Sequence, residues 1–212
     1  MVASSSSPGQ PVAPRRGRRS AGESGREQIL AAATAQFHER GYQGTTIRAI
    51  ADAAGVDTKL VHYYFGTKAE LFATMIGTAF ESWGFPELLE ELPTSPGASP
   101  GAAYLRTVFT ALEESEVGPV FIGLVRNLGT HEESRRIFLD FVSRHLIARL
   151  APHIPGERAE VRVSLAGSQM LGIIMGRYVL RVPPLAELGR EELAAALGPT
   201  LDPYFHGEVA GL

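Results

Sequence analysis

Residues 45–65 constrain the fold more than any other stretch, because two short helical patterns flank a single glycine there. Four apolar residues in the first pattern recur at the spacing of one helix face: Ile47, Ile50, Ala51 and Ala54. Thr45 or Thr46 supplies a side-chain oxygen that caps this helix at its start. Gly55 can adopt the left-handed conformation that ends a helix, and Asp57 can cap a second helix.

The second helix of this pattern has one face to bury and one face to expose. Val56, Val61 and Phe65 would pack the two helices together, which leaves four residues pointing outward: Thr58, Lys59, His62 and Tyr63. Two short helices joined by a glycine turn form a helix–turn–helix, whose second helix can enter the major groove of DNA. The same pattern also fits an ordinary helical hairpin with a solvated outer face.

The segments on both sides favour the helix–turn–helix. Upstream, a capping box from Ser24 to Glu27 predicts a helix that ends at Gly41 and buries one apolar face: Ile29, Leu30, Ala33 and Phe37. Downstream, Thr67 and Glu70 form a second capping box. The helix that it starts extends to about residue 82 and links this region to the rest of the chain.

The block from Ile29 to Phe72 resembles the DNA-binding domain of the tetracycline-repressor (TetR) family of bacterial transcriptional regulators. The resemblance is carried by Phe37, Gly41-Tyr42, Thr45-Thr46-Ile47, Ile50-Ala51, Ala54-Gly55-Val56, Tyr63-Tyr64-Phe65 and Lys68-Ala69-Glu70-Leu71. His62 stands where the family more often carries tyrosine, and Asp57 stands where serine is usual. Asp57 still caps a helix, but its charge would repel a nearby phosphate.

The resemblance implies an all-α protein: a three-helix helix–turn–helix DNA-binding domain followed by a larger helical domain for ligand binding and dimerisation. We place the first domain at residues 23–66 and the second at residues 67–212. Residues 1–22 contain almost nothing to bury, so we expect a disordered basic tail there. The arginines of this tail fit either an arm that reaches DNA or a solubilising segment.

The expected contacts with double-stranded DNA divide by chemistry. Arg48 and Lys59 can bond O6 and N7 of guanine, and Leu60 can touch a thymine methyl group. His62 suits either a base or a phosphate. The remaining predicted DNA-binding residues would position the protein on phosphates: Thr46, Thr58, Tyr63, Tyr64 and Lys68.

The net charge of −3 at pH 7 conceals an asymmetry along the chain. Residues 1–66 contain eight Lys/Arg and five Asp/Glu, a balance of +3, whereas residues 67–212 contain twelve and eighteen, a balance of −6. The basic end therefore coincides with the expected DNA-binding domain. Because the excess is small, affinity has to come from a few placed contacts and from dimerisation.

The sequence contains no cysteine, which excludes disulfides and thiolate metal sites. The most apolar window, residues 170–180, is interrupted by two glycines and Arg177, and it falls short of the roughly 20 residues that cross a bilayer. Polar residues rather than an apolar run follow the N-terminal arginines, so we expect no secretory signal. These observations predict a cytoplasmic protein with no membrane partner.

Two helices near the C-terminus carry the expected homodimer interface. On the helix predicted at 157–181, small residues recur at every fourth position: Ser168, Gly172 and Gly176. A last helix from about residue 189 carries a leucine stripe at the same spacing: Leu193, Leu197 and Leu201. Pro199 should kink or divide this helix. The resemblance implies a four-helix bundle with a second subunit, and close packing within one subunit is the alternative.

Aromatic and polar residues on otherwise apolar helices predict the wall of a small-molecule site. The candidate effector-binding residues are Phe80, Trp83, Tyr104, Phe109, Phe121, Arg126, Gln169 and Tyr178. The resemblance implies an effector cavity between these helices, and core packing is the alternative for each aromatic residue. Because few full charges lie on this lining, we expect an apolar or amphiphilic effector, with Arg126, Gln169 or Tyr104 as a polar anchor.

Catalysis has little support in the sequence. The six histidines form no recognised metal-binding spacing, and no GxxxxGK[ST] or GxGxxG phosphate loop is present. Ser164 and Ser168 lack the glycine surroundings of a nucleophile elbow. We therefore expect no enzyme, no metal and no cofactor.

The sequence thus predicts a sequence-specific repressor that a small apolar effector releases from a palindromic operator. Effector binding would shift the helix at 67–82 and change the spacing of the two recognition helices in the dimer. Three alternatives stay open: an activator or ligand-independent regulator of the same fold, an architectural DNA-binding protein, and a helical enzyme or binding module.

Overall fold

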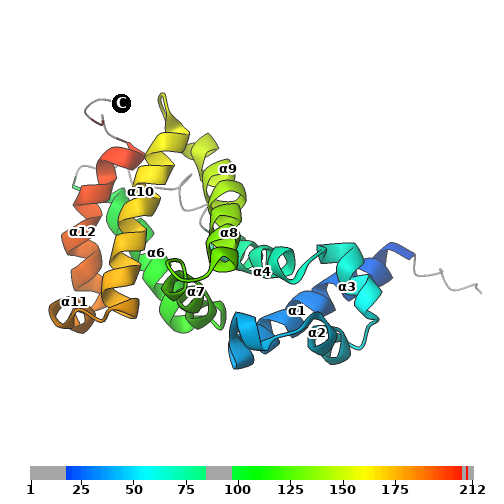
Figure 1. The fold of residues 1–212 in the computed structure, drawn as a ribbon. Helices are drawn as coiled ribbons and strands as arrows, with labels where there is room; N and C mark the ends of the chain where they lie inside the picture. Colours follow the sequence, from blue (N-terminus) through cyan, green and yellow to red (C-terminus); the bar gives the residue numbers. More distant parts are fainter. Residues whose placement is uncertain (1–17, 85–96, 207–208, 210–212) are drawn as a thin grey trace, which may run out of the picture.

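The computed structural model describes residues 18–84, 97–206 and 209, and across these residues the chain forms helices and turns with no strand. The expected all-α class is therefore confirmed. Figure 1 shows two parts joined by α4 (Lys68–Ser82). We call the first part the reader; it contains α1 (Arg18–Gly44), α2 (Ile47–Ala54) and α3 (Thr58–Phe65).

The second part, which we call the body, spans residues 97–206 and contains the remaining helices. These are α6 (Pro100–Glu114), α7 (Val117–Arg126), α8 (Glu132–Phe141), the π-helix η1 (Val142–Ile147), α9 (Ala148–Leu150), the 3-10 helix η2 (Ala151–His153), α10 (Ala159–Ile174), the π-helix η3 (Met175–Val179), α11 (Pro183–Glu187) and α12 (Arg190–Phe205).

The helix–turn–helix forms at the predicted residues. The Thr46 hydroxyl accepts a hydrogen bond from the Ala49 amide at 3.1 Å and caps α2. Gly55 ends α2 with φ 67° and ψ 32°, the left-handed conformation that a side chain would strain. Asp57 Oδ1 then accepts from the Lys59 amide at 2.7 Å and caps α3. The two helices are thus capped separately, and the three residues from Gly55 to Asp57 join them.

The start of α1 differs from the prediction. The capping box at Ser24 is wrong, because the helix already begins at Arg18 and passes through residue 24. The disordered tail expected at 1–22 is likewise wrong for residues 18–22, which are helical, and residues 1–17 lie outside the described part of the chain. Gly41, with φ 68° and ψ 175°, breaks the helical path where the sequence placed its end.

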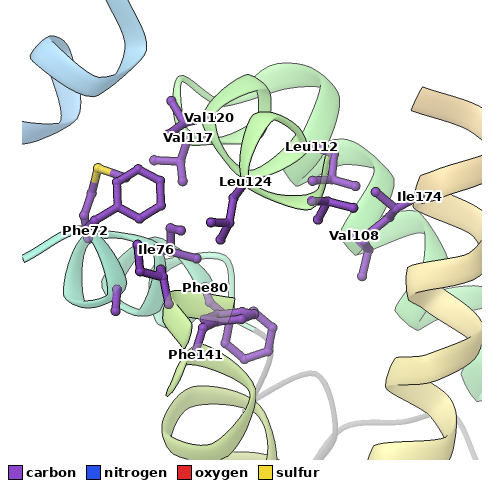
Figure 2. Packing of buried hydrophobic residues seen from close by; sticks show 14 of the residues in the cluster. Phe72, Ile76, Phe80, Val108, Leu112, Val117, Val120, Leu124, Phe141 and Ile174 are labelled. Carbon is purple, nitrogen blue, oxygen red and sulfur yellow. The ribbon is translucent and has the colours of Figure 1, made fainter. Parts of the chain in front are cut away.

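The capping box that starts α4 is confirmed. The Glu70 amide donates to the Thr67 hydroxyl at 3.2 Å, and the Thr67 amide donates to the Glu70 carboxylate at 2.8 Å. The bond from the Thr67 amide, together with a second from the Thr67 hydroxyl at 2.9 Å, holds the pKa of the Glu70 carboxyl below its usual value. Figure 2 shows the body-facing side of α4, where Phe72, Ile76 and Phe80 lie in the buried core that α7 also lines. The linking helix is therefore packed into the body over most of its length.

The body is built on a close pairing of α6 and α12. A Cβ added at Gly198 would overlap the backbone of Ala102, and a Cβ added at Gly101 would overlap the carbonyl of Gly198. Only glycine at both positions permits this approach. Pro199 does not divide α12, which runs unbroken from Arg190 to Phe205.

This pairing corrects part of the predicted dimer face. Leu193 is 1% exposed and Leu201 is 0% exposed within one subunit, so neither side chain has surface to offer a partner. Their assignment to the dimer interface is wrong, because the leucine stripe of α12 faces its own subunit. Leu197 is half-buried.

The three small residues on α10 and η3 have different surroundings. Ser168 and Gly172 are exposed, and a Cβ added at Gly172 would meet no atom within 4 Å. A Cβ at Gly176 would lie 2.7 Å from Leu185 Cδ2, so Gly176 makes room for α11. Packing within one subunit therefore accounts for Gly176 but leaves Ser168 and Gly172 open.

Candidate DNA interface and effector cavity

The outer face of α3 projects away from the reader core. Val61 and Phe65 are buried on the inner side, whereas Lys59, His62 and Tyr63 are exposed on the outer side. Tyr63 is 80% exposed, unusually high for an aromatic residue, and it lies beside Tyr64 with ring centroids 5.2 Å apart. A face with a cation and an uncovered aromatic ring suits contact with phosphates and bases.

Three further predicted DNA-binding residues, Arg48, His62 and Thr58, differ in how firmly they are held. Arg48 on α2 has an 86% exposed side chain and only a loose ion pair with Asp52 at 4.0 Å. The His62 ring lies with Nδ1 2.7 Å from the Gly66 carbonyl. Because a carbonyl only accepts, Nδ1 carries the proton, and Nε2 is left to accept from a ligand when the ring is neutral. Thr58 is half-buried at the start of α3.

The predicted roles of Leu60, Thr46 and Lys68 need revision. Leu60 is half-buried and lies near α1, where a Cβ at Gly25 would be 3.9 Å from its Cδ2. We therefore drop its expected contact with thymine. The Thr46 hydroxyl already caps α2.

The Lys68 ammonium, at the start of α4, bonds backbone carbonyls of the reader. Its Nζ donates to the carbonyls of Tyr42 at 3.0 Å and Thr45 at 3.2 Å, and it lies 4.2 Å from the centre of the Tyr42 ring. These contacts fasten the start of α4 to the end of α1. One N–H of the ammonium is left for a phosphate.

Contacts between reader and body, which the sequence did not predict, centre on Tyr42. Its ring packs with those of Phe37 and Phe72 at centroid distances of 5.9 and 4.9 Å, and its hydroxyl donates to Glu133 at 2.6 Å. Burial and the bond to Glu133 raise the pKa of Tyr42. Tyr42 lies in the last residues of α1, just after the break at Gly41, and in the sequence it stands out only as part of the family resemblance.

The body contains an apolar cavity of about 60 Å³. Its wall comes from α4, α6, α7, α8, η1 and α10: Ile76, Phe80, Trp83, Tyr104, Val108, Ala111, Leu112, Phe121, Phe141, Leu146, Met170 and Ile174. In Figure 2, Phe80 and Phe141 stand opposite Val108, Leu112 and Ile174. The structure thus brings together Phe80, Trp83, Tyr104 and Phe121 of the predicted lining.

The other four predicted lining residues point elsewhere. Phe109 is 0% exposed in the core, and Arg126 is exposed at the end of α7. Gln169 Nε2 donates to the Tyr204 hydroxyl at 2.7 Å between α10 and α12. Tyr178 donates to Glu113 at 2.7 Å, and burial together with this bond raises its pKa. None of them borders the cavity, so their assignment to it is wrong.

None of the described residues that line the cavity has a charged side chain. Burial raises the pKa of Tyr104 to about 12, so this phenol stays neutral at pH 7. Trp83 is the single tryptophan of the chain and lies on the wall. A charged ligand would lose its hydration here without gaining a partner.

Among the described residues, no group of three or more His, Asp or Glu side chains is arranged to hold a metal ion. No helix in that part of the chain is long and apolar enough to cross a membrane.

Two sequence profiles of one family match the chain. The profile described as "Bacterial regulatory proteins, tetR family" matches residues 29–75, and that described as "Tetracyclin repressor-like, C-terminal domain" matches residues 99–205. The first covers the helix–turn–helix and the start of α4. The second covers nearly the whole body.

Known proteins match at two levels. The HTH-type transcriptional regulator HbdR of Aromatoleum sp. (strain CIB) is 50% identical over 54 residues, which are 25% of this chain and only 24% of HbdR. The HTH-type transcriptional repressor BepR of Brucella suis biovar 1 (strain 1330) is 28% identical over 187 residues, 86% of this chain and 81% of BepR. A solved TetR-family regulator from Streptomyces coelicolor A3 aligns with a TM-score of 0.63 at 29% identity, over 89% of this chain and 98% of the other.

Proposed function

The chain belongs to the TetR family of bacterial transcriptional regulators, and we propose that it is a repressor that leaves its operator when a small uncharged molecule occupies the body cavity. The observation that carries the DNA-binding part is the outer face of α3, where Lys59, His62 and Tyr63 are exposed and take no part in the reader core. The family consists of regulators rather than enzymes.

Helix α4 can transmit ligand binding in the cavity to the reader, because it contacts both. Its residues Ile76 and Phe80 line the cavity, and its first residue, Lys68, is bonded to the end of α1. A ligand that needs more room than the cavity has must displace this helix, and the reader moves with it. The ligand releases DNA only to the extent that it binds the displaced state better than the DNA-bound state.

Replacing Lys59 with alanine tests the recognition helix. We expect operator affinity to fall by roughly 1–3 kcal/mol and the preference at one base pair to relax, because one base-edge contact is lost. Lys68→Ala should instead weaken all duplexes about equally and also lower the melting temperature, because its ammonium bonds two carbonyls of the reader. Fluorescence anisotropy on a selected operator and a scrambled duplex measures both; unchanged affinity in Lys59→Ala would show that α3 does not read the bases.

We further propose a homodimer that uses the open face of α10. Ser168 and Gly172 leave this face free for a close approach by a second copy. Two-fold symmetry would then place two α3 helices in successive major grooves, about one helical turn apart or a multiple of it.

A bulky side chain at Gly172 tests this interface. Gly172→Leu should shift the dimer towards monomer by roughly 1–3 kcal/mol per subunit, because overpacking keeps the helices apart. Its own fold should be intact, since no described atom beyond the backbone of its own helix lies within 4 Å of the new Cβ. Light scattering at micromolar concentration gives the mass; a wild-type monomer would contradict the proposal.

The fluorescence of Trp83, which lies on the cavity wall, reports whether the cavity is occupied. Uncharged aromatic and alicyclic compounds that bind the cavity should change Trp83 fluorescence and lower operator affinity about 5- to 150-fold, the range of a 1–3 kcal/mol coupling. Ala111→Leu, which places extra carbon in the cavity wall, should abolish both effects while DNA binding persists.

The small cavity also favours a second candidate. A volume of about 60 Å³ lies far below the roughly 300–1,000 Å³ of ordinary ligand sites. If no compound changes Trp83 fluorescence, and operator affinity is the same in Ala111→Leu and wild type, a ligand-independent regulator of the same fold is the better assignment.

A further inference from the structure

We propose that a second small-molecule site lies at the joint between reader and body, and that it takes a ring compound bearing a carboxylate. The joint is formed where the last turns of α1 meet α7 and the start of α8, as Figure 1 shows. It is separate from the body cavity and shares no lining residue with it.

A hollow of about 280 Å³ opens at this joint. Its lining comes from the last turns of α1, from α7 and the residue that ends it, and from Ser134 near the start of α8. Its volume approaches the lower end of the roughly 300–1,000 Å³ typical of ligand sites, whereas the body cavity of about 60 Å³ does not. In this conformation, the joint has more room for a ligand than the cavity.

Glycines on both walls keep this hollow open. A Cβ added at Gly41 on the reader side, or at Gly123 on the body side, would meet no atom within 4 Å. Gly123 lies inside α7, where any side chain can adopt the backbone conformation. A larger residue at 123 would therefore occupy the hollow without straining the helix.

The lining selects the ligand class. Tyr42 is half-buried and offers the main apolar surface to a ring, and Val120 and Leu124 add small areas, being 7% and 4% exposed. Among the described lining residues Arg40 is the one permanent charge and none is a carboxylate; the two carboxylates nearby, Glu39 and Glu133, are already engaged by Arg40 and by the Tyr42 hydroxyl. The ion pair of Arg40 with Glu39 measures 3.5 Å between two largely exposed side chains, so it opposes a turn of Arg40 towards a ligand only weakly. A carboxylate can then form the paired hydrogen bonds that guanidinium favours.

A ligand in the hollow would affect the hydrogen bonds that fix the reader to the body. Tyr42 donates to Glu133 at 2.6 Å across the joint, and His38 Nδ1 donates to the Glu116 carbonyl at 2.8 Å. A ligand that widens the gap weakens both bonds and alters the reader's position. This coupling rests on the proposed DNA-binding function, whereas binding itself does not.

Two probes of opposite charge test the site on the full-length protein. In calorimetric titrations, phenylacetate should bind and benzylamine should not. Gly123→Leu should lower the affinity for phenylacetate by about tenfold or more, because the leucine side chain fills the hollow. Arg40→Met should lower the affinity for phenylacetate several-fold. Arg40→Lys, which keeps the charge, should retain much of that affinity.

The body cavity supplies the control. Phenylacetate at the joint should leave Trp83 fluorescence nearly unchanged and should bind Ala111→Leu as it binds wild type. Arg40 is exposed, so its variants keep the test decisive even if Gly123→Leu fails to fold.

Four results would overturn the site: no binding of phenylacetate at millimolar concentration, equal binding of benzylamine, affinity unchanged in both Gly123→Leu and Arg40→Met, or loss of binding in Ala111→Leu. Binding at the joint with operator affinity unchanged would overturn the coupling alone. If the wild-type protein bound no operator DNA when no probe was added, the proposed function would be refuted but this site would not.

Discussion

Replacing Phe72 with alanine is expected to lower the free energy of unfolding by about 3–5 kcal/mol, the range for removing a buried phenylalanine ring. Phe72 lies on α4 with no exposed surface. Its ring packs edge-on against Phe37 at 4.8 Å and Tyr42 at 4.9 Å between centroids. Because these rings lie where α1 meets α4, the loss should also loosen the reader from the body. Urea unfolding followed by circular dichroism measures the change.

Phe72→Leu is the matched control. Leucine keeps an apolar side chain in the cluster, so the loss should be less than half that of alanine. A further measurement separates stability from coupling: operator affinity should fall more in the alanine variant than in leucine under conditions where both are folded. A loss below about 1 kcal/mol in Phe72→Ala would contradict the burial of this ring.

Gly198→Ala is expected to destabilise the body by roughly 1–3 kcal/mol or more, although alanine ordinarily favours a helix over glycine by about 1 kcal/mol. The new methyl group would overlap the backbone of Ala102, and backbone cannot rotate away as a side chain can. Helices α6 and α12 must therefore separate. The melting temperature should fall accordingly.

The same substitution at Gly172 provides the comparison. Both glycines lie within helices, but the Cβ at 172 meets no atom of its own subunit. Gly172→Ala should therefore leave a monomeric subunit as stable as wild type or slightly more stable. If both variants behaved alike, the close approach of α6 and α12 would be wrong.

The reader was predictable because its signals are local. Thr46, Gly55, Asp57 and the Thr67–Glu70 box each act on backbone groups within a few residues, so neighbouring sequence suffices to place them. The start of α1 could not be predicted for a related reason. A serine cap contributes only about 1 kcal/mol, and Ser24 can be passed when the residues before it also form helix.

The body was less predictable because its faces depend on which helices meet. The leucine stripe of α12 was recognised, but nothing local shows that α6 rather than a second subunit covers it. Gln169 and Tyr178 are polar residues on an apolar helix, which fits a ligand anchor or a bond to a neighbouring helix equally well. Their partners, Tyr204 and Glu113, are 35 and 65 residues away in sequence. Periodicity gives the face of a helix but not the identity of what lies opposite.

The division of α3 into a packed face and an uncovered face bears on how such a regulator can change over evolution. Val61 and Phe65 are fixed by the reader core, whereas Lys59, His62 and Tyr63 contribute nothing to it. Under the proposed function, substitutions at Lys59 and Tyr63 would alter the recognised operator without removing a core contact, whereas the His62 ring also bonds the Gly66 carbonyl. Under that proposal, DNA specificity can change by single substitutions, each of which leaves the reader folded.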